Sequence, residues 1–171
     1  SLSPDRENLV GWQAVGLLLH YPVGHYIRRR CQEASMPEPV KDRLAMIAGM
    51  APELQPGRFV FCALNDLPLS TAISDGAICL FREAEGVSVL VPVDLAEAEG
   101  LPVELPMCQI ALQVFSSLAG VGLTAAVSAA LGTADIPCTM IAAARHDHVI
   151  VPEDRAMEAL AVLKSLSASA R

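Results

Sequence analysis

A repeat at a spacing of 60 residues is the feature that most limits the folds open to this chain. When the chain is shifted by 60 positions, six of the thirteen residues from position 84 onward meet an identical residue. The identical pairs are Ala84 and Ala144, Val89 and Val149, Val91 and Val151, Pro92 and Pro152, Asp94 and Asp154, and Ala96 and Ala156. Self-similarity at a fixed spacing indicates a duplicated structural unit. We therefore expect an α+β protein with two units of the same design in tandem.

The apolar periodicity and the turn residues predict the order strand, helix or loop, strand, strand, helix in each unit. In the first unit, the predicted strands cover 58–64, 77–82 and 87–91, a loop or irregular helix covers 65–76, and a helix covers 92–99. In the second unit, the predicted strands cover 107–115, 138–144 and 149–151, and helices cover 120–134 and 152–166. A further helix is predicted over 38–50. Because the first unit lacks a clear first helix, we expect the better binding pocket in the second unit.

The first 35 residues differ from the rest of the chain. Residues 9–19 read LVGWQAVGLLL, which is too short for a membrane span and is closed by His20 and Pro22. Acidic residues precede this stretch and arginines follow it, which is the reverse of a secretory signal. We expect an atypical extension over 1–35, a first unit over 36–105 and a second unit over 106–171.

Composition narrows the partners and the compartment. The net charge is −7 and only 4% of residues are aromatic, so neither a basic face nor a stacking platform for nucleic acid is expected. The same acidic balance argues against anionic membranes. The five cysteines are odd in number, far apart and never in a C-x-x-C pattern, and they are Cys31, Cys62, Cys79, Cys108 and Cys138. We interpret them as reduced thiols of a cytoplasmic protein.

The stretch Ser116–Thr124 (SSLAGVGLT) is the strongest candidate for chemistry. It follows a predicted strand and enters a predicted helix, with Gly120 and Gly122 at the junction. The unpaired amides at a helix start favour a carboxylate or phosphate. The stretch matches neither the dinucleotide motif G-x-G-x-x-G nor a Walker loop. Two interpretations stay open: a small-ligand site, or glycines that only permit close packing of helix on sheet.

The second candidate is the sequence His146-Asp147-His148. Alternate residues of a strand share a face, so the two imidazoles could meet one metal ion, but two ligands are too few for a closed tetrahedral site. The simpler alternative is a turn in which Asp147 caps and the histidines bond to backbone; a ligand contact is a third. A hydrolase built from Ser116 or Ser117 with these residues lacks the G-x-S-x-G elbow. We expect no metal, no cofactor and no enzymatic activity.

Four segments resemble a known family. PGRFVFC (56–62), FREAEGVSVLV (81–91), SSLAGVGLTAA (116–126) and HDHVIVP (146–152) are similar to small bacterial proteins built from ACT domains, which look like detached versions of the regulatory region of aspartate kinase. The likeness covers roughly residues 40–168. It implies two tandem ferredoxin-like βαββαβ units, leaves open whether they exchange terminal strands, and implies regulatory amino-acid binding without catalysis.

The resemblance also implies a binding site. In ACT domains the ligand lies near the loop between the first strand and the first helix, often where two units meet. Carried onto this sequence, the candidate ligand-binding residues are Ser116, Ser117, Gly120, Val121, Gly122, Leu123 and Thr124, with Ile141 on the facing strand and His146. Asp at position 122 is then expected to block binding while leaving most of the fold intact; if Gly122 packs tightly on the sheet or has a positive φ, the substitution should instead lower the stability of the unit.

The chain departs from the family pattern near this site, at Phe115, Ala143, Ala144 and Arg145. If these positions touch the ligand, specificity has changed or binding is lost. The alternative function is a homo-oligomeric interaction module without a ligand. In either case we expect a homodimer, because ferredoxin-like units leave edge strands and an open sheet face that pairing can cover.

Overall fold

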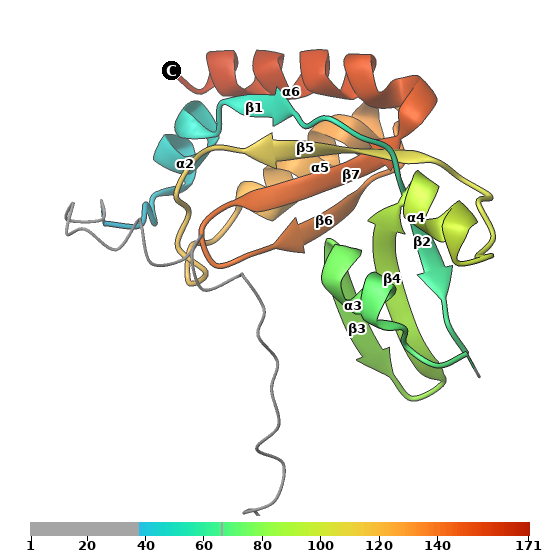
Figure 1. The fold of residues 1–171 in the computed structure, drawn as a ribbon. Coiled ribbons are helices and arrows are strands. Elements are labelled where there is room, and N and C mark those ends of the chain that lie inside the picture. Colours follow the sequence, from blue (N-terminus) through green and yellow to red (C-terminus); the bar gives the residue numbers. More distant parts are fainter. Residues whose placement is uncertain (1–37, 66) are drawn as a thin grey trace, which may run out of the picture. The chain divides into compact units, whose positions relative to one another are not determined.

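The fold of residues 38–65 and 67–171 comes from a computed structural model (Figure 1). The helices are α2 (Arg43–Gly49), α3 (Thr71–Gly76), α4 (Val93–Ala98), α5 (Leu123–Thr133) and α6 (Ala156–Ser169), with a 3₁₀ turn η1 (Glu153–Arg155). The strands are β1 (Pro52–Leu54), β2 (Phe59–Ala63), β3 (Cys79–Glu83), β4 (Gly86–Pro92), β5 (Met107–Leu112), β6 (Thr139–Ala142) and β7 (Asp147–Pro152). The expected extension over 1–35 lies outside the described residues.

All the strands join one antiparallel sheet. Its order is β3-β4-β2-β5-β7-β6, and β1 pairs with β5. The two halves of the sheet meet where β2 pairs with β5 at a single position, Phe59 opposite Met107. Each half has the strand and helix order that the repeat predicts, so the expected pair of ferredoxin-like α+β units is confirmed.

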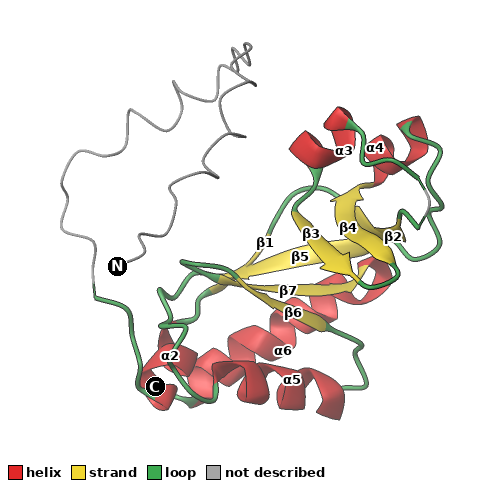
Figure 2. Ribbon diagram, turned by 90° about the horizontal axis from the view of Figure 1, so that it is seen from below, coloured by secondary structure: helices red, strands yellow, loops and turns green. Residues whose placement is uncertain are grey.

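In each half of the sheet the helices cover one face. Figure 2 shows α2, α5 and α6 against β5, β6 and β7, while α3 and α4 lie against β2, β3 and β4. Each half therefore has its own core: Val89, Val91 and Ile73 are buried in the first, and Val149, Val127 and Leu163 in the second. The opposite face of the sheet carries a third cluster of Phe59, Leu90, Met107 and Ile150.

The start of the described chain packs with the second unit, although the first unit follows it in sequence. Strand β1 pairs along β5, with Pro52 opposite Leu112 and Leu54 opposite Ile110. Met46, Ile47 and Met50 of the preceding segment are buried in the core of the second unit. The segment before the first unit thus contributes a terminal strand to the second unit. Strand β1 was not predicted, because three residues are too short to show an alternating pattern.

Several element boundaries differ from the sequence-based expectation. Strand β5 ends at Leu112, and β7 begins at Asp147 because that residue pairs with both Leu112 and Ala142. Helix α3 forms within the segment expected to be a loop or irregular helix. The Ser70 hydroxyl caps it by accepting a hydrogen bond from the amide of Ile73.

Candidate functional site

A cavity of about 70 Å³ lies at the amino-terminal end of α5. Its walls come from α2, from the loop between β5 and α5, and from the adjoining ends of β6 and β7. The lining residues are Met46, Ser116, Ser117, Leu118, Gly120, Leu123, Thr124, Ala142 and Asp147. Apart from Met46 of α2, the lining residues belong to the second unit, in which the sequence predicts the better binding pocket.

The loop between β5 and α5 is held by backbone hydrogen bonds to the segment before α2. Val40 donates its amide to the carbonyl of Phe115 and accepts from the amide of Ser117, both at 2.9 Å. Within the loop, the amide of Gly120 donates to the carbonyl of Ser117 at 2.7 Å. These bonds fix the loop from both sides, so the cavity is preformed.

Helix α2 approaches the two loop glycines closely. A methyl group at Gly120 would lie 2.8 Å from Sδ of Met46, and one at Gly122 would lie 2.8 Å from Cδ of Arg43. Gly122 is also left-handed, with φ of 107°. An Asp at position 122 would therefore strain the backbone and displace Arg43, so the structure favours the alternative in which the substitution lowers stability over the one in which most of the fold stays intact.

The free amides at the start of α5 have neither a side-chain hydrogen-bond acceptor nor a nearby acidic residue in their own helix. Its N-cap is Gly122, so no side chain caps the helix, and its first turn holds no acidic residue. The first amides of an α-helix have no intrahelical acceptor and form the positive end of the helix dipole. Leu123 and Thr124, which begin α5, both line the cavity.

A buried carboxylate closes another wall of the cavity. Asp147 is only 6% exposed, and its Oδ2 accepts a hydrogen bond from Oγ of Ser116 at 2.9 Å. Asp147 is the first residue of β7 rather than the cap of a turn, which corrects the interpretation made from the sequence. Asp147 lines the cavity beside the loop, although it was not among the ligand-binding residues expected from the sequence.

The two flanking histidines bond elsewhere. Nδ1 of His146 lies 3.3 Å from the carbonyl oxygen of Val114, to which it donates. The side-chain amide of Gln109 donates to Nδ1 of His148 at 2.9 Å. Burial, with a smaller effect from His146, lowers the pKa of His148 below its usual value, although Asp147 opposes the shift. Within 38–65 and 67–171, no cluster of three or more His, Cys, Asp or Glu has a metal-binding arrangement.

The candidate residues named from the sequence divide into two groups. Ser116, Ser117, Gly120, Leu123 and Thr124 line the cavity. The others do not: Val121 is 81% exposed, Gly122 lies beneath Arg43, Ile141 packs on the open face of the sheet, and His146 is bonded to Val114. The departures from the family pattern, Phe115, Ala143, Ala144 and Arg145, are also absent from the lining.

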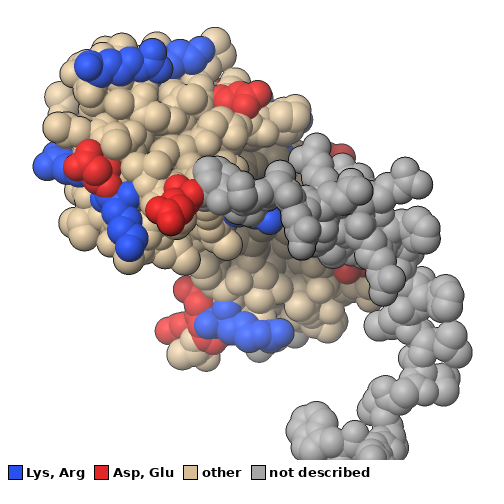
Figure 3. Space-filling view, turned by 90° about the vertical axis from the view of Figure 1, so that its left-hand side faces the viewer, with Lys and Arg blue, Asp and Glu red and all other residues tan. Residues whose placement is uncertain are grey.

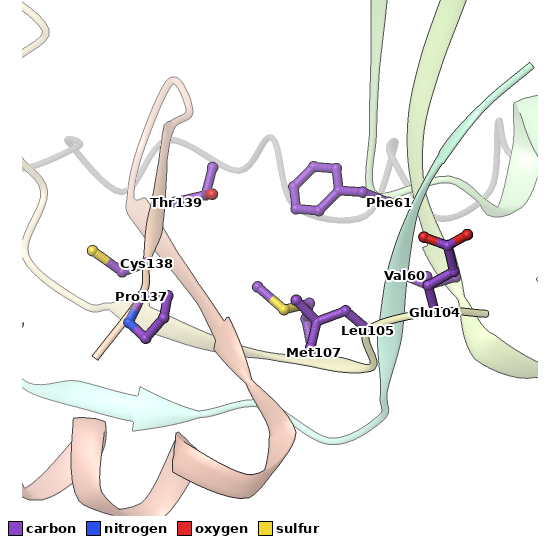
Figure 4. A pocket seen from close by; sticks show the side chains of 8 residues that line it. All are labelled: Val60, Phe61, Glu104, Leu105, Met107, Pro137, Cys138 and Thr139. Carbon is purple, nitrogen blue, oxygen red and sulfur yellow. The ribbon is translucent and has the colours of Figure 1, made fainter. Parts of the chain in front are cut away.

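A second, larger cavity of about 340 Å³ lies on the open side of the sheet, where the two units meet (Figure 4). Phe61 points toward Thr139 across it, and Leu105 and Met107 lie between them. The other lining residues are Val60, Glu104, Pro137 and Cys138. This cavity is mainly apolar.

The described cysteines are free thiols. Cys62 and Cys108 are buried, Cys79 and Cys138 are half-buried, and burial raises the pKa of all four thiols. Cys31 lies outside the described residues. Unreactive, unpaired thiols of this kind behave as small apolar core residues.

The surface in Figure 3 carries acidic and basic side chains separated by uncharged surface, rather than one large patch of a single sign. Among the residues that the structure describes, no helix has the length and apolar character needed to cross a bilayer.

Two ferredoxin-like units in tandem, each with the order strand, helix, strand, strand, helix, define the class of α+β fold to which this protein belongs. The comparison with family patterns identifies the class: residues 40–108 and residues 104–165 each match the ACT domain. The chain belongs to the ACT domain family. No curated protein sequence matches it.

Solved structures agree with this assignment. A Vibrio cholerae protein of unknown function, titled a possible transport protein, is 35% identical with a TM-score of 0.65 over 72% of this chain and 94% of its own. The regulatory subunit of aspartate kinase from Thermus flavus is 10% identical with a TM-score of 0.50, covering 67% and 95%. Aspartate kinase from Clostridium acetobutylicum is 10% identical with a TM-score of 0.54, covering 67% of this chain and 34% of that enzyme. The two kinase comparisons establish likeness of fold.

Proposed function

We propose that this protein is a non-catalytic regulatory module that binds a small free amino acid in the cavity at the start of α5. One observation carries the proposal: a preformed cavity joins the uncapped start of a helix to a buried carboxylate, Asp147. ACT domains are regulatory, small-molecule-binding modules, and the cavity lies at the loop where the family places its ligands.

The volume of the cavity limits the ligand. Drug-sized ligands occupy pockets of about 300–1,000 Å³, whereas this cavity measures about 70 Å³. Only the smallest amino acids fit that space without rearrangement of α2 or the loop. We therefore expect glycine, L-alanine or L-serine rather than lysine or an aromatic amino acid.

The bonding around the cavity supports a role without catalysis. The hydroxyl of Ser116 donates a hydrogen bond to Asp147, and His146 donates a hydrogen bond to the carbonyl of Val114. Neither serine of the loop is hydrogen-bonded to a histidine, as an activated nucleophile would be. The four described thiols, kept weakly acidic by burial, support a cytoplasmic setting.

Calorimetric titration with the twenty amino acids tests this function, with a matched pair of variants. Ala142 lines the cavity and Ala143 does not, although both are exposed neighbours in sequence. We expect binding of one of the three smallest amino acids, loss of that binding in Ala142→Leu, and retention in Ala143→Leu. Binding of none of the twenty would refute the proposal.

The open face of the sheet favours a second proposal, a homodimer formed through that face. Phe61, Phe81 and Leu105 are exposed there, next to the apolar cavity of Figure 4. Exposed apolar patches of this kind mark association surfaces. Light scattering should show a dimer that Phe61→Lys dissociates, whereas Met157→Lys, a change at an exposed residue of α6, should not. A monomeric wild-type protein at micromolar concentration would contradict the homodimer.

A further inference from the structure

We infer that the larger cavity, on the open face of the sheet, is a second ligand site that binds an apolar amine, with Glu104 taking the ammonium group. The cavity measures about 340 Å³ and lies between β2, the linker before β5 and the start of β6. It shares no lining residue with the cavity at the start of α5. The inference is therefore independent of the proposed amino-acid site.

The cavity exists because the two halves of the sheet separate at this place. Strand β2 pairs with β5 only at Phe59 and Met107, so among the described residues the rest of β2 has no strand beside it on that edge. Phe61 follows this pair on β2 and points across the cavity toward Thr139 of β6 (Figure 4). The junction of two units is a common place for small-molecule sites.

Most of the wall is apolar and only partly covered by the protein. Phe61 is 38% exposed and Leu105 is 55% exposed, although both are large apolar side chains. Met107 is buried and belongs to the apolar cluster of the open face, which holds the wall in place. A ligand with an apolar ring or a branched chain would remove these side chains from water, and that removal is the main favourable contribution to binding.

The volume of the cavity limits the apolar part of the ligand. Pockets for drug-sized ligands measure about 300–1,000 Å³, so a cavity of about 340 Å³ lies at the lower end of that range. A single aromatic ring on a short chain is of suitable size. A ligand without an apolar part would leave most of the wall in contact with water.

One charged group decides the polarity of the ligand. Among the described residues that line the cavity, Glu104 alone is charged, and within the described chain it has no ion pair and no hydrogen bond. Figure 4 shows it on the side of the cavity opposite Pro137, Cys138 and Thr139. An ammonium group there would gain a charge-assisted hydrogen bond, whereas a carboxylate or phosphate would be repelled. An amine joined to an apolar body is the class of ligand that suits both the wall and the charge.

Calorimetric titration with matched probes tests the inference. The probes are 2-phenylethylamine, 2-phenylethanol and phenylacetate, which share a ring and differ in charge, and ethylamine, which carries the charge without the ring. The variants are Glu104→Gln, which removes the carboxylate, and Thr139→Phe, which fills the cavity. Thr139 is exposed on an edge strand, where an aromatic residue is well tolerated.

Each variant has a matched control. Glu85→Gln removes a carboxylate from the exposed turn between β3 and β4, and Glu85 does not line the cavity. Thr139→Val removes the hydroxyl group and keeps the shape of the side chain. Ala142→Leu changes the cavity at the start of α5 and tests the independence of the two sites. Circular dichroism melting and light scattering compare the fold and the oligomeric state of each variant with those of the wild type.

We expect the wild type to bind 2-phenylethylamine saturably, 2-phenylethanol about three- to tenfold more weakly, and neither phenylacetate nor ethylamine at the same concentrations. The difference is modest because Glu104 is exposed and water screens its charge. Glu104→Gln should remove the preference for the amine over the alcohol, and Thr139→Phe should abolish the binding of both. The three controls should bind as the wild type does.

A wild-type protein that does not bind 2-phenylethylamine would overturn the inference, as would binding that Thr139→Phe leaves unchanged. A preference for the amine that persists in Glu104→Gln would overturn the assignment of the ammonium group to Glu104. None of these results bears on the amino-acid site, which glycine, L-alanine and L-serine test separately.

Discussion

Ser116 and Asp147 are 31 positions apart in the sequence and share a hydrogen bond of 2.9 Å between Oγ and Oδ2. The bond ties the loop before α5 to the first residue of β7. It also holds the carboxylate in a fixed orientation at the wall of the cavity. The loop and the strand therefore form one rigid site.

Replacement of Ser116 by Ala should destabilise the protein. The change leaves a largely buried carboxylate oxygen without its donor, which costs about 1–3 kcal/mol of unfolding free energy. Urea denaturation measures this cost. Ser165→Ala, on the exposed side of α6, is the control and should change the unfolding free energy by less than about 0.5 kcal/mol. Equal effects of the two substitutions would show that the bond to Asp147 contributes nothing.

Two glycines of the same helix region should respond oppositely to alanine. Gly122 has φ of 107° and lies against Arg43, so Gly122→Ala should destabilise the protein by about 1–3 kcal/mol. Gly132, within α5, has open space around an added methyl group. Gly132→Ala should therefore stabilise by about 0.5–1 kcal/mol through helix propensity. Denaturation midpoints that shift in the same direction would contradict this assignment.

Because the segment before the first unit packs in the core of the second unit, a mutation in this segment should destabilise the second unit. Met50 is completely buried among side chains of the second unit, so Met50→Ala should cost about 2–5 kcal/mol. Hydrogen exchange should become faster in β5, β7 and α6 than in β3 and β4. Met157→Ala, at a residue 68% exposed, serves as the control and should change neither. If Met50→Ala made hydrogen exchange faster only in β3 and β4, the packing of this segment on the second unit would be contradicted.

The lowered pKa of His148 makes stability depend on pH. The folded protein holds a proton on this residue less readily than the unfolded chain does, because burial disfavours the charged form. The contribution of His148 is therefore fully present above its unfolded pKa, near 6.5, and is lost as pH falls through the lower folded pKa. His148→Gln should flatten the rise in melting temperature between about pH 5 and pH 7. His146→Gln is the comparison, and an identical pH profile for His148→Gln and the wild type would refute the assignment.

The sequence predicted the duplicated units because their strands and helices are local patterns. Val89 and Val91 point to the same face of β4, and the same spacing returns at Val149 and Val151 of β7. Strand β1 gave no such signal, since its pairing is decided by the free edge of β5 rather than by its own three residues. The start of α5 was placed three residues early, because the amide of Gly120 turns back to Ser117 instead of entering the helix.

The side chains that reach the loop from other elements could not be predicted either, because their positions also depend on packing between distant parts of the chain. Arg43 and Met46 reach the loop through the packing of α2 on the second unit, more than 70 positions away in sequence. Asp147 was singled out, but its burial and its bond to Ser116 depend on the register of β7 against β5. Neither of these contacts can be predicted from local periodicity or motif spacing.

The account rests on one claim, that a small amino acid binds at the start of α5. Titration of the ¹⁵N-labelled protein with glycine, L-alanine or L-serine, followed by two-dimensional NMR, tests it most directly. We expect one of them to shift the amide signals of Ser116–Thr124, Met46 and Asp147 in a saturable manner, and to leave those of Phe61, Leu105 and Met107 in place. No saturable shift with any of the three, or shifts confined to the apolar cavity around Phe61, would contradict the claim.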